Sequence, residues 1–129
     1  CCCARAALLS ETRGGYLKLE MVLEMNAAGF ASGMMLRQTV LHHEGMLVDF
    51  YQAAPVSCWM KNTLSPLDMI FIAADGPIRP IHSNAVPLST DAIPSQFPVR
   101  GVLEINGGSA KLLGIKVGDK VRNAIFGNV

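Results

Sequence analysis

The sequence has few charged residues and no long hydrophobic run. Charged side chains make up 16% of the 129 residues, and the formal net charge is +1. A balance this close to neutral gives no electrostatic reason to expect nucleic acid or an anionic membrane surface as a partner. No apolar stretch approaches the roughly 20 residues that span a bilayer as a helix, so we predict no transmembrane segment.

Cysteine is also scarce, and its spacing excludes two classes of small protein. Three cysteines are consecutive at positions 1–3, and Cys58 stands alone. Neither arrangement supplies the Cys-x-x-Cys pairs of a zinc site or the spacing of a disulfide framework. The neighbouring His42 and His43, followed by Glu44, invite a metal site, but adjacent side chains point apart. We therefore predict no metal and no other cofactor.

Half of the residues are hydrophobic, which argues against disorder and predicts one domain with a core. We interpret residues 1–14 as an unstructured or signal-derived N-terminal stub and residues 15–129 as a single β-rich domain. The leading cysteines are open to three interpretations: a signal-peptide remnant, a lipidation site or an arbitrary start.

The stretch from residue 57 to residue 72 has the most informative pattern. Residues 57–63 alternate, which predicts a strand with Trp59 and Lys61 on one face and Asn62 on the other. Pro66 predicts a bend. Residues 67–73 then form an almost continuous apolar run, typical of a strand covered on both faces. Asp68 interrupts this run, and an unpaired buried carboxylate costs several kcal/mol. It therefore lies at a wet edge, pairs with Lys61 or Asn62, or caps a turn.

The remaining segments complete the fold prediction. Alternation over residues 16–25 predicts a half-exposed strand near a sheet edge, and residues 99–105 predict a strand with Arg100 and Glu104 on one face. Short helices are expected over residues 27–32 and 110–113, each followed by glycine. About seven short strands and two short helices predict a β-rich α+β fold. We expect a small barrel-like or strongly curved, mostly antiparallel sheet.

Several longer motifs occur in a fixed order within residues 16–122. They are Trp59-Met60-Lys61-Asn62-Thr63, Pro66-Leu67-Asp68-Met69-Ile70-Phe71-Ile72, Asp75-Gly76, Asn84-Ala85-Val86-Pro87-Leu88-Ser89-Thr90, Val102-Leu103-Glu104-Ile105-Asn106-Gly107-Gly108 and Gly114-Ile115-Lys116-Val117-Gly118-Asp119. In this order they resemble the domain-of-unknown-function 192 family of bacteria and archaea. The resemblance implies a β-rich fold and frequent export, so we expect a periplasmic or secreted protein. It implies no activity.

The leading functional hypothesis is a binding module for a small polar ligand such as a sugar or a peptide fragment. In this interpretation Trp59 and the proline-containing loop over residues 84–98 wall a shallow pocket. The predicted ligand-binding residues are Trp59, Lys61, Asn62, Asp68, Asn84, Arg100 and Glu104.

Two alternatives remain open. The first is a hydrolase or lyase that uses Asp68 and Glu104 as an acid/base pair, which requires both carboxyl groups on the same side of the sheet. The second is an envelope interaction domain without a pocket, which an exposed apolar patch on residues 16–25 would favour. The sequence assigns no catalytic residue and no oligomeric state.

Overall fold

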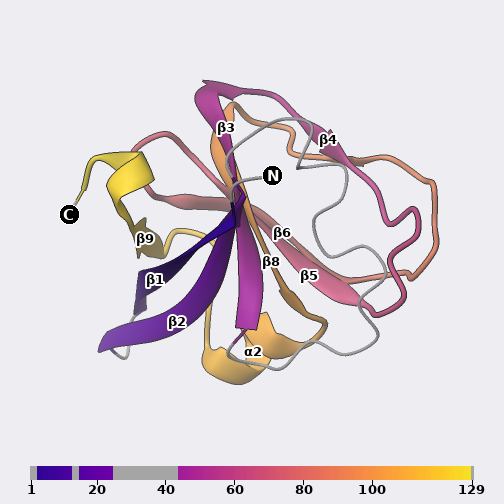
Figure 1. Ribbon diagram of the computed structural model, residues 1–129, viewed down its shortest axis with the longest axis horizontal. Coiled ribbons are helices and arrows are strands. Elements are labelled where there is room, and N and C mark those ends of the chain that lie inside the picture. The colour runs from indigo at the N-terminus through magenta and orange to yellow at the C-terminus, as the bar shows by residue number, and fades with distance from the viewer. Residues whose placement is uncertain (1–2, 13–14, 25–43, 129) are drawn as a thin grey trace.

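The computed structural model describes the backbone of residues 3–12, 15–24 and 44–128 and the side chains of residues 45–128 (Figure 1). Within these residues the main sheet has the strand order β6-β5-β8-β3-β2-β1-β9. Its strands, in chain order, are β1 (Cys3–Thr12), β2 (Gly15–Glu24), β3 (Glu44–Ala54), β5 (Leu67–Ile72), β6 (Ile78–Ala85), β8 (Val99–Asn106) and β9 (Lys120–Arg122). A separate pair joins β4 (Ser57–Cys58) to β7 (Ile93–Pro94).

The strand pairing confirms a mostly antiparallel, β-rich fold. Among the described strand pairs, β2 and β3 run parallel and the other pairs run antiparallel. Figure 1 shows the strands splayed around the middle of the sheet, which is the appearance of a strongly twisted sheet. The helical elements described are the short helix α2 (Ser109–Leu113) and the single 3-10 turn η1 (Ala124–Phe126).

The sheet is not a closed barrel, so the barrel-like part of the fold prediction is not confirmed. Strands β6 and β9 are its two ends, and an isolated bridge joins Pro77, just before β6, to Lys120 of β9. Proline has no backbone N–H, and both Pro77 and Pro80 lie in this part of the chain. A continuous ladder between the two ends would lack these donors. The predicted helix at 110–113 is confirmed by α2, and the one at 27–32 lies outside the described residues.

The N-terminal segment differs from the prediction. Within the segment interpreted as an unstructured or signal-derived stub, Cys3–Thr12 form β1, which pairs along its whole length with β2 and through three residues with β9. Strand β2 therefore lies between β1 and β3 and is not near the sheet edge. Residues 3–12 show no regular alternation, so their pattern gave no sign of this strand, although its main partner β2 follows after two residues and only β9 lies far along the chain.

Both faces of the central strands are buried, as the apolar run of β5 predicts: every residue of β5 is buried. One face packs against α2 and the C-terminal segment, and its buried residues are Leu47, Ile70, Ile72, Ile78, Leu103, Ile105, Ala110, Ile115, Val121 and Phe126. The opposite face packs against β4, β7 and their flanking segments, and its buried residues are Met46, Val48, Cys58, Met60, Leu67, Met69, Phe71, Ala85, Ile93, Val99 and Val102. The candidate site lies on segments that cover this second face.

Candidate functional site

Two short turns lie side by side next to β4, and we call residues 59–64 and 86–89 the paired turns. In the first turn the N–H of Thr63 donates to the carbonyl of Met60 at 3.0 Å, and in the second the N–H of Ser89 donates to that of Val86 at 3.3 Å. Strand β4 ends at Cys58, so the predicted strand over residues 57–63 is wrong beyond its first two residues. A turn forms instead, with Asn62 at a φ of 58°.

Backbone hydrogen bonds hold the two turns together. The N–H of Met60 donates to the carbonyl of Ser89, and the N–H of Leu88 donates to that of Thr63, both at 3.0 Å. Met60 is fully buried in the second core and Thr63 is 5% exposed, so the first turn is anchored from below. The turn that carries Trp59 is thus hydrogen-bonded to residues 86–89 of the loop over residues 84–98.

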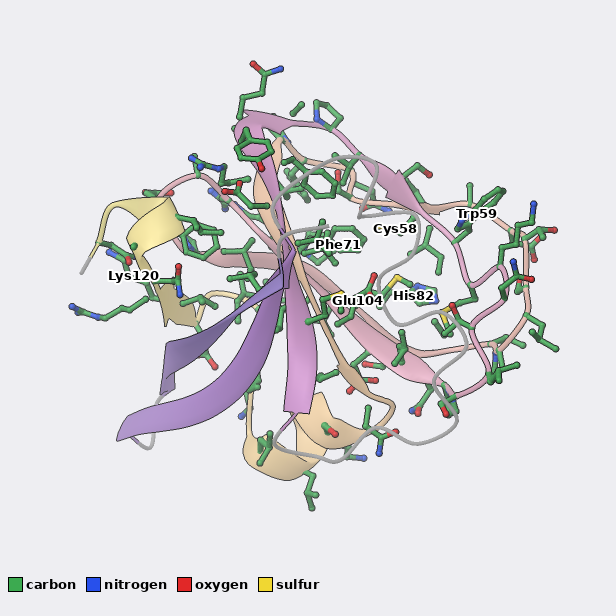
Figure 2. All side chains as sticks on the ribbon, viewed as in Figure 1. Cys58, Trp59, Phe71, His82, Glu104 and Lys120 are labelled. Atoms are coloured by element: carbon green, nitrogen blue, oxygen red, sulfur yellow. The ribbon has the colours of Figure 1, made fainter. Side chains whose placement is uncertain are left out.

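The side chains that leave the paired turns outwards are mostly apolar. Trp59 is 44% exposed, Leu64 41%, Val86 68% and Leu88 58%. The ammonium of Lys61 lies 5.1 Å from the centroid of the Trp59 ring, within the range of a cation–π interaction. Figure 2 shows Trp59 at the outer margin of the molecule beside β4. The paired turns therefore present an aromatic ring, a cation and aliphatic side chains to solvent.

Leu88 adopts a backbone conformation that leucine rarely takes. Its φ is 65°, and a left-handed conformation costs an L-residue roughly 1–2 kcal/mol. The preceding Pro87 favours this kind of turn, but its third position is normally glycine or asparagine. Strained residues of this type cluster at functional sites, where the surrounding structure maintains them. The hydrogen bond from Leu88 to Thr63 is such a constraint.

Asp68 is fully buried and accepts hydrogen bonds from three backbone N–H groups. Its Oδ1 accepts from Asn84 at 2.8 Å and from Gly108 at 3.0 Å, and its Oδ2 accepts from Ala110 at 2.9 Å. Gly108 is the N-cap of α2 and has no side chain to satisfy the helix's free N–H groups. Asp68 supplies that cap from β5. Of the three interpretations of this carboxylate, the structure supports turn capping, and its hydrogen-bond partners are neither Lys61 nor Asn62.

Two different causes explain the glycines beside Asp68. A Cβ atom on Gly107 would lie 2.7 Å from Oδ1 of Asn84, too close for any other residue to fit without movement. Gly108 has a φ of 87°, which glycine adopts without strain. Asn84 itself has a φ of 51°. The hydrogen bond from Asn84 to Asp68 thus fixes the backbone near the end of β6, two residues before Val86, where the second of the paired turns begins.

Arg100 lies elsewhere and is paired with a carboxylate that sequence reasoning missed. Its Nε contacts Oδ1 of Asp49 at 2.6 Å and its Nη2 contacts Oδ2 at 3.2 Å, and Asp49 also accepts from the N–H of Tyr51 at 2.7 Å. The hydrogen bond to Asp49 raises the pKa of Arg100 above its ordinary value. Asp49 is 1% exposed. The sequence did contain a signal for this pair, because Asp49 interrupts the apolar run at residues 46–50 as Asp68 interrupts the run at residues 67–73.

Glu104 lies on the opposite face of the sheet from Asp68. In the pairing of β5 with β8, Asp68 is opposite Ile105, whereas Glu104 is opposite Met69. Directly opposite residues point to the same face and successive residues alternate. Glu104 is 5% exposed, and its charge acts on the Cys58 thiol. Burial, with the charge of Glu104 as a smaller cause, raises the pKa of the Cys58 thiol to about 12. Cys58 is thus a buried, unreactive thiol, as its apolar setting predicts.

The predicted site residues therefore fall into four groups. Trp59, Lys61 and Asn62 lie together on the paired turns, Asp68 and Asn84 are hydrogen-bonded beneath the second turn, Arg100 pairs with Asp49, and Glu104 lies in the second core. In Figure 2 Glu104 is near the middle of the molecule, away from Trp59. Besides Asp49, sequence reasoning did not single out the exposed Leu64, nor Val86 and Leu88 within the predicted loop, although Val86-Pro87 was a turn signal there.

The described residues contain no cluster of three or more histidine, cysteine, aspartate or glutamate side chains that could hold a metal ion. In the same part of the chain we find no helix of the length and apolarity needed to cross a membrane.

The chain belongs to the domain-of-unknown-function 192 family, whose model, described as an uncharacterised ACR, matches residues 9–123. It is similar to a crystal structure of a candidate transcription regulator from Sinorhizobium meliloti 1021, with 42% identity and a TM-score of 0.92. That match covers 97% of this chain and 98% of the other. It is also similar to a protein of unknown function from Novosphingobium aromaticivorans DSM 12444, with 34% identity, a TM-score of 0.89 and coverages of 95% and 94%. No curated protein matches the chain.

Proposed function

We propose that this protein is a binding module that holds a small polar ligand, sugar- or peptide-like, on the paired turns. One observation carries the proposal. The single tryptophan of the chain, Trp59, is 44% exposed, and the ammonium of Lys61 lies 5.1 Å from its ring centroid. Ligand sites combine aromatic and apolar side chains with a few polar groups that fix the ligand's orientation. Asn62, exposed at the tip of the first turn, adds an amide that both donates and accepts hydrogen bonds.

The rigidity of the paired turns supports the proposal. Two hydrogen bonds join the turns, each turn has its own internal hydrogen bond, and Met60 anchors the first turn in the core. A surface that is ordered before binding loses little conformational entropy when a ligand arrives. The strain at Leu88 fits the same interpretation, because strained backbone positions cluster at functional sites, where the surrounding structure maintains them.

Asp68 and Asn84 have a positioning role in this proposal. The hydrogen bond from the N–H of Asn84 to Asp68 and the full burial of Ala85 set the path of the chain into Val86. They therefore determine where the second turn lies, without contacting the ligand. Arg100 and Glu104 are not assigned to the ligand surface, because Arg100 binds Asp49 and Glu104 lies in the core.

The enzyme hypothesis is not favoured by the geometry. Catalysis by two carboxylates needs both groups to reach one substrate bond. The strand register puts Asp68 and Glu104 on opposite faces of a sheet whose two faces are both buried. The oxygens of Asp68 accept three backbone hydrogen bonds, so they are committed to the fold.

Titration followed by Trp59 emission tests the proposal, because the chain has no other tryptophan. A panel of mono- and disaccharides and short peptides should contain members that shift the emission and raise the melting temperature. The Trp59→Ala variant should lose the rise in melting temperature, whereas Leu112→Ala, which removes a 66% exposed leucine on α2, should retain it. A panel in which both variants respond like the wild type to every compound would refute the proposal.

We further propose, on the family resemblance, that the protein acts in the periplasm or outside the cell. Fractionation of cells that produce the full-length protein tests this. Recovery of the protein only with cytoplasmic markers would contradict it.

A further inference from the structure

The charge and the apolar character of the paired turns narrow the ligand class. Lys61 is the only charged residue in residues 59–64 and 86–89, and it stands among exposed Trp59, Leu64, Val86 and Leu88. We infer that the ligand is the free C-terminal end of a peptide with an aliphatic last residue, whose carboxylate binds Lys61. This inference rests on the proposed function and specifies the ligand of the same surface.

The carboxylate is assigned from the environment of Lys61. Its side chain is exposed, and its ammonium is held at the Trp59 ring, so its position is defined before binding. Among the described residues, the ion pair is that of Arg100 with Asp49. No carboxylate of these residues forms an ion pair with the ammonium of Lys61. A carboxylate offers a charge-assisted hydrogen bond, the stronger class of such contacts. Capture of a C-terminal carboxylate is a recurring mode of peptide recognition.

The aliphatic residue is assigned from the second turn. Val86 and Leu88 are 68% and 58% exposed, among the most exposed large apolar side chains described. A sugar stacked on Trp59 would need polar partners around the ring for its hydroxyl groups, but the neighbouring side chains of this turn are aliphatic. A leucine or valine side chain would instead remove apolar surface from water on both partners.

The peptide backbone is assigned from Asn62. Its side-chain amide is exposed at the tip of the first turn, beside Lys61. An amide matches a peptide group in both its donor and its acceptor. A fatty acid has the same aliphatic and carboxylate groups but no peptide group. Hydrogen bonds to the Asn62 amide are therefore open to a peptide but not to a fatty acid chain, and they distinguish the two ligands.

Two peptides that differ only at the C-terminus test the inference. One is a pentapeptide ending in Val-Leu with a free carboxylate, and the other is its C-terminal amide, each titrated by Trp59 emission and by calorimetry. The free acid should bind about two- to five-fold more tightly, the range expected for an exposed ion pair. The Lys61→Gln variant should lose this difference. Leu88→Ala should weaken both peptides to a similar extent, and Leu112→Ala should weaken neither.

Each outcome bears on the inference. Equal binding of acid and amide would overturn the carboxylate assignment and leave the binding module intact. Octanoate binding as tightly as the acid peptide, with no effect of Asn62→Ala, would identify a fatty acid and overturn the peptide assignment. Binding of sugars with no peptide binding would also overturn it. If no compound of any class changes Trp59 emission, both this inference and the proposed function are refuted.

Discussion

Replacement of Asp68 by asparagine tests the conclusion that this carboxylate joins three segments of the fold. In the native chain Oδ1 accepts from Asn84 and Gly108, and Oδ2 accepts from Ala110. Asparagine has the same shape and keeps one oxygen, but it places an NH₂ group where the second oxygen lay. One backbone N–H would then face a donor at a site with 0% exposure, where water cannot replace the lost acceptor.

The expected loss in the free energy of unfolding is about 2–4 kcal/mol. A hydrogen bond to a charged group contributes about 1.5–3 kcal/mol, and a buried donor without a partner costs about 1–3 kcal/mol. These two quantities partly describe the same loss, so they are not added in full. Native domains are stable by about 5–15 kcal/mol, so the variant should still fold at neutral pH.

Urea unfolding at pH 7, followed by Trp59 emission, measures this loss. Asp119→Asn is the matched control, because the Oδ2 atom of Asp119 accepts a single backbone hydrogen bond from Lys116 in an exposed turn; we expect a loss below about 1 kcal/mol. Amide exchange adds a local readout, since the N–H of Ala110 should exchange faster in the Asp68 variant. Equal losses in the two variants, with unchanged protection of Ala110, would refute the reasoning.

Three further predictions follow from buried or strained groups. Arg100→Gln should lower the free energy of unfolding, measured in urea titrations, by about 2–4 kcal/mol, because it leaves the 1% exposed carboxylate of Asp49 without its cation. A loss below about 0.5 kcal/mol would contradict this prediction. Folding raises the pKa of the Cys58 thiol from 9.0 to about 12, so the unfolded chain loses the thiol proton at a lower pH than the folded chain. The free energy of unfolding should therefore fall between pH 9 and pH 12, by about 1.4 kcal/mol at pH 10 relative to pH 7. The Cys58→Ala variant, compared at both pH values, should lack this part of the decrease. Leu88→Asn should raise the melting temperature, because asparagine tolerates a φ of 65°, while ligand binding weakens; a lower melting temperature would show that Leu88 is not strained.

Local patterns predicted the elements that local physics specifies. The apolar run at residues 67–72 predicted a strand covered on both faces, and all of its residues are buried. The glycine at position 114 predicted the end of the short helix, and it is the C-cap of α2 with a φ of 74°. Both predictions rest on the preferences of neighbouring residues in the chain, so they needed no knowledge of distant partners.

Partners far along the chain could not be predicted in the same way. The backbone groups that bind Asp68 lie 16, 40 and 42 residues away, and Arg100 lies 51 residues from Asp49. For Asp68 the sequence indicated that a buried carboxylate needs a partner, and it left pairing with Lys61 or Asn62 and turn capping open. The actual partners of Asp68 are backbone N–H groups, which every segment carries, so residue type could not choose between these interpretations.

The sequence alone determined the β-rich class, the bend at Pro66, and the fact that residues 59–64 and 86–89 contain one charge among mostly apolar side chains. Only the tertiary structure decided that these turns lie side by side and that Asp68 and Glu104 face opposite ways. The physical reason is strand register. Side chains alternate with a period of two, so a shift of one residue between β5 and β8 would exchange the faces. The choice of register depends on how both cores pack at once.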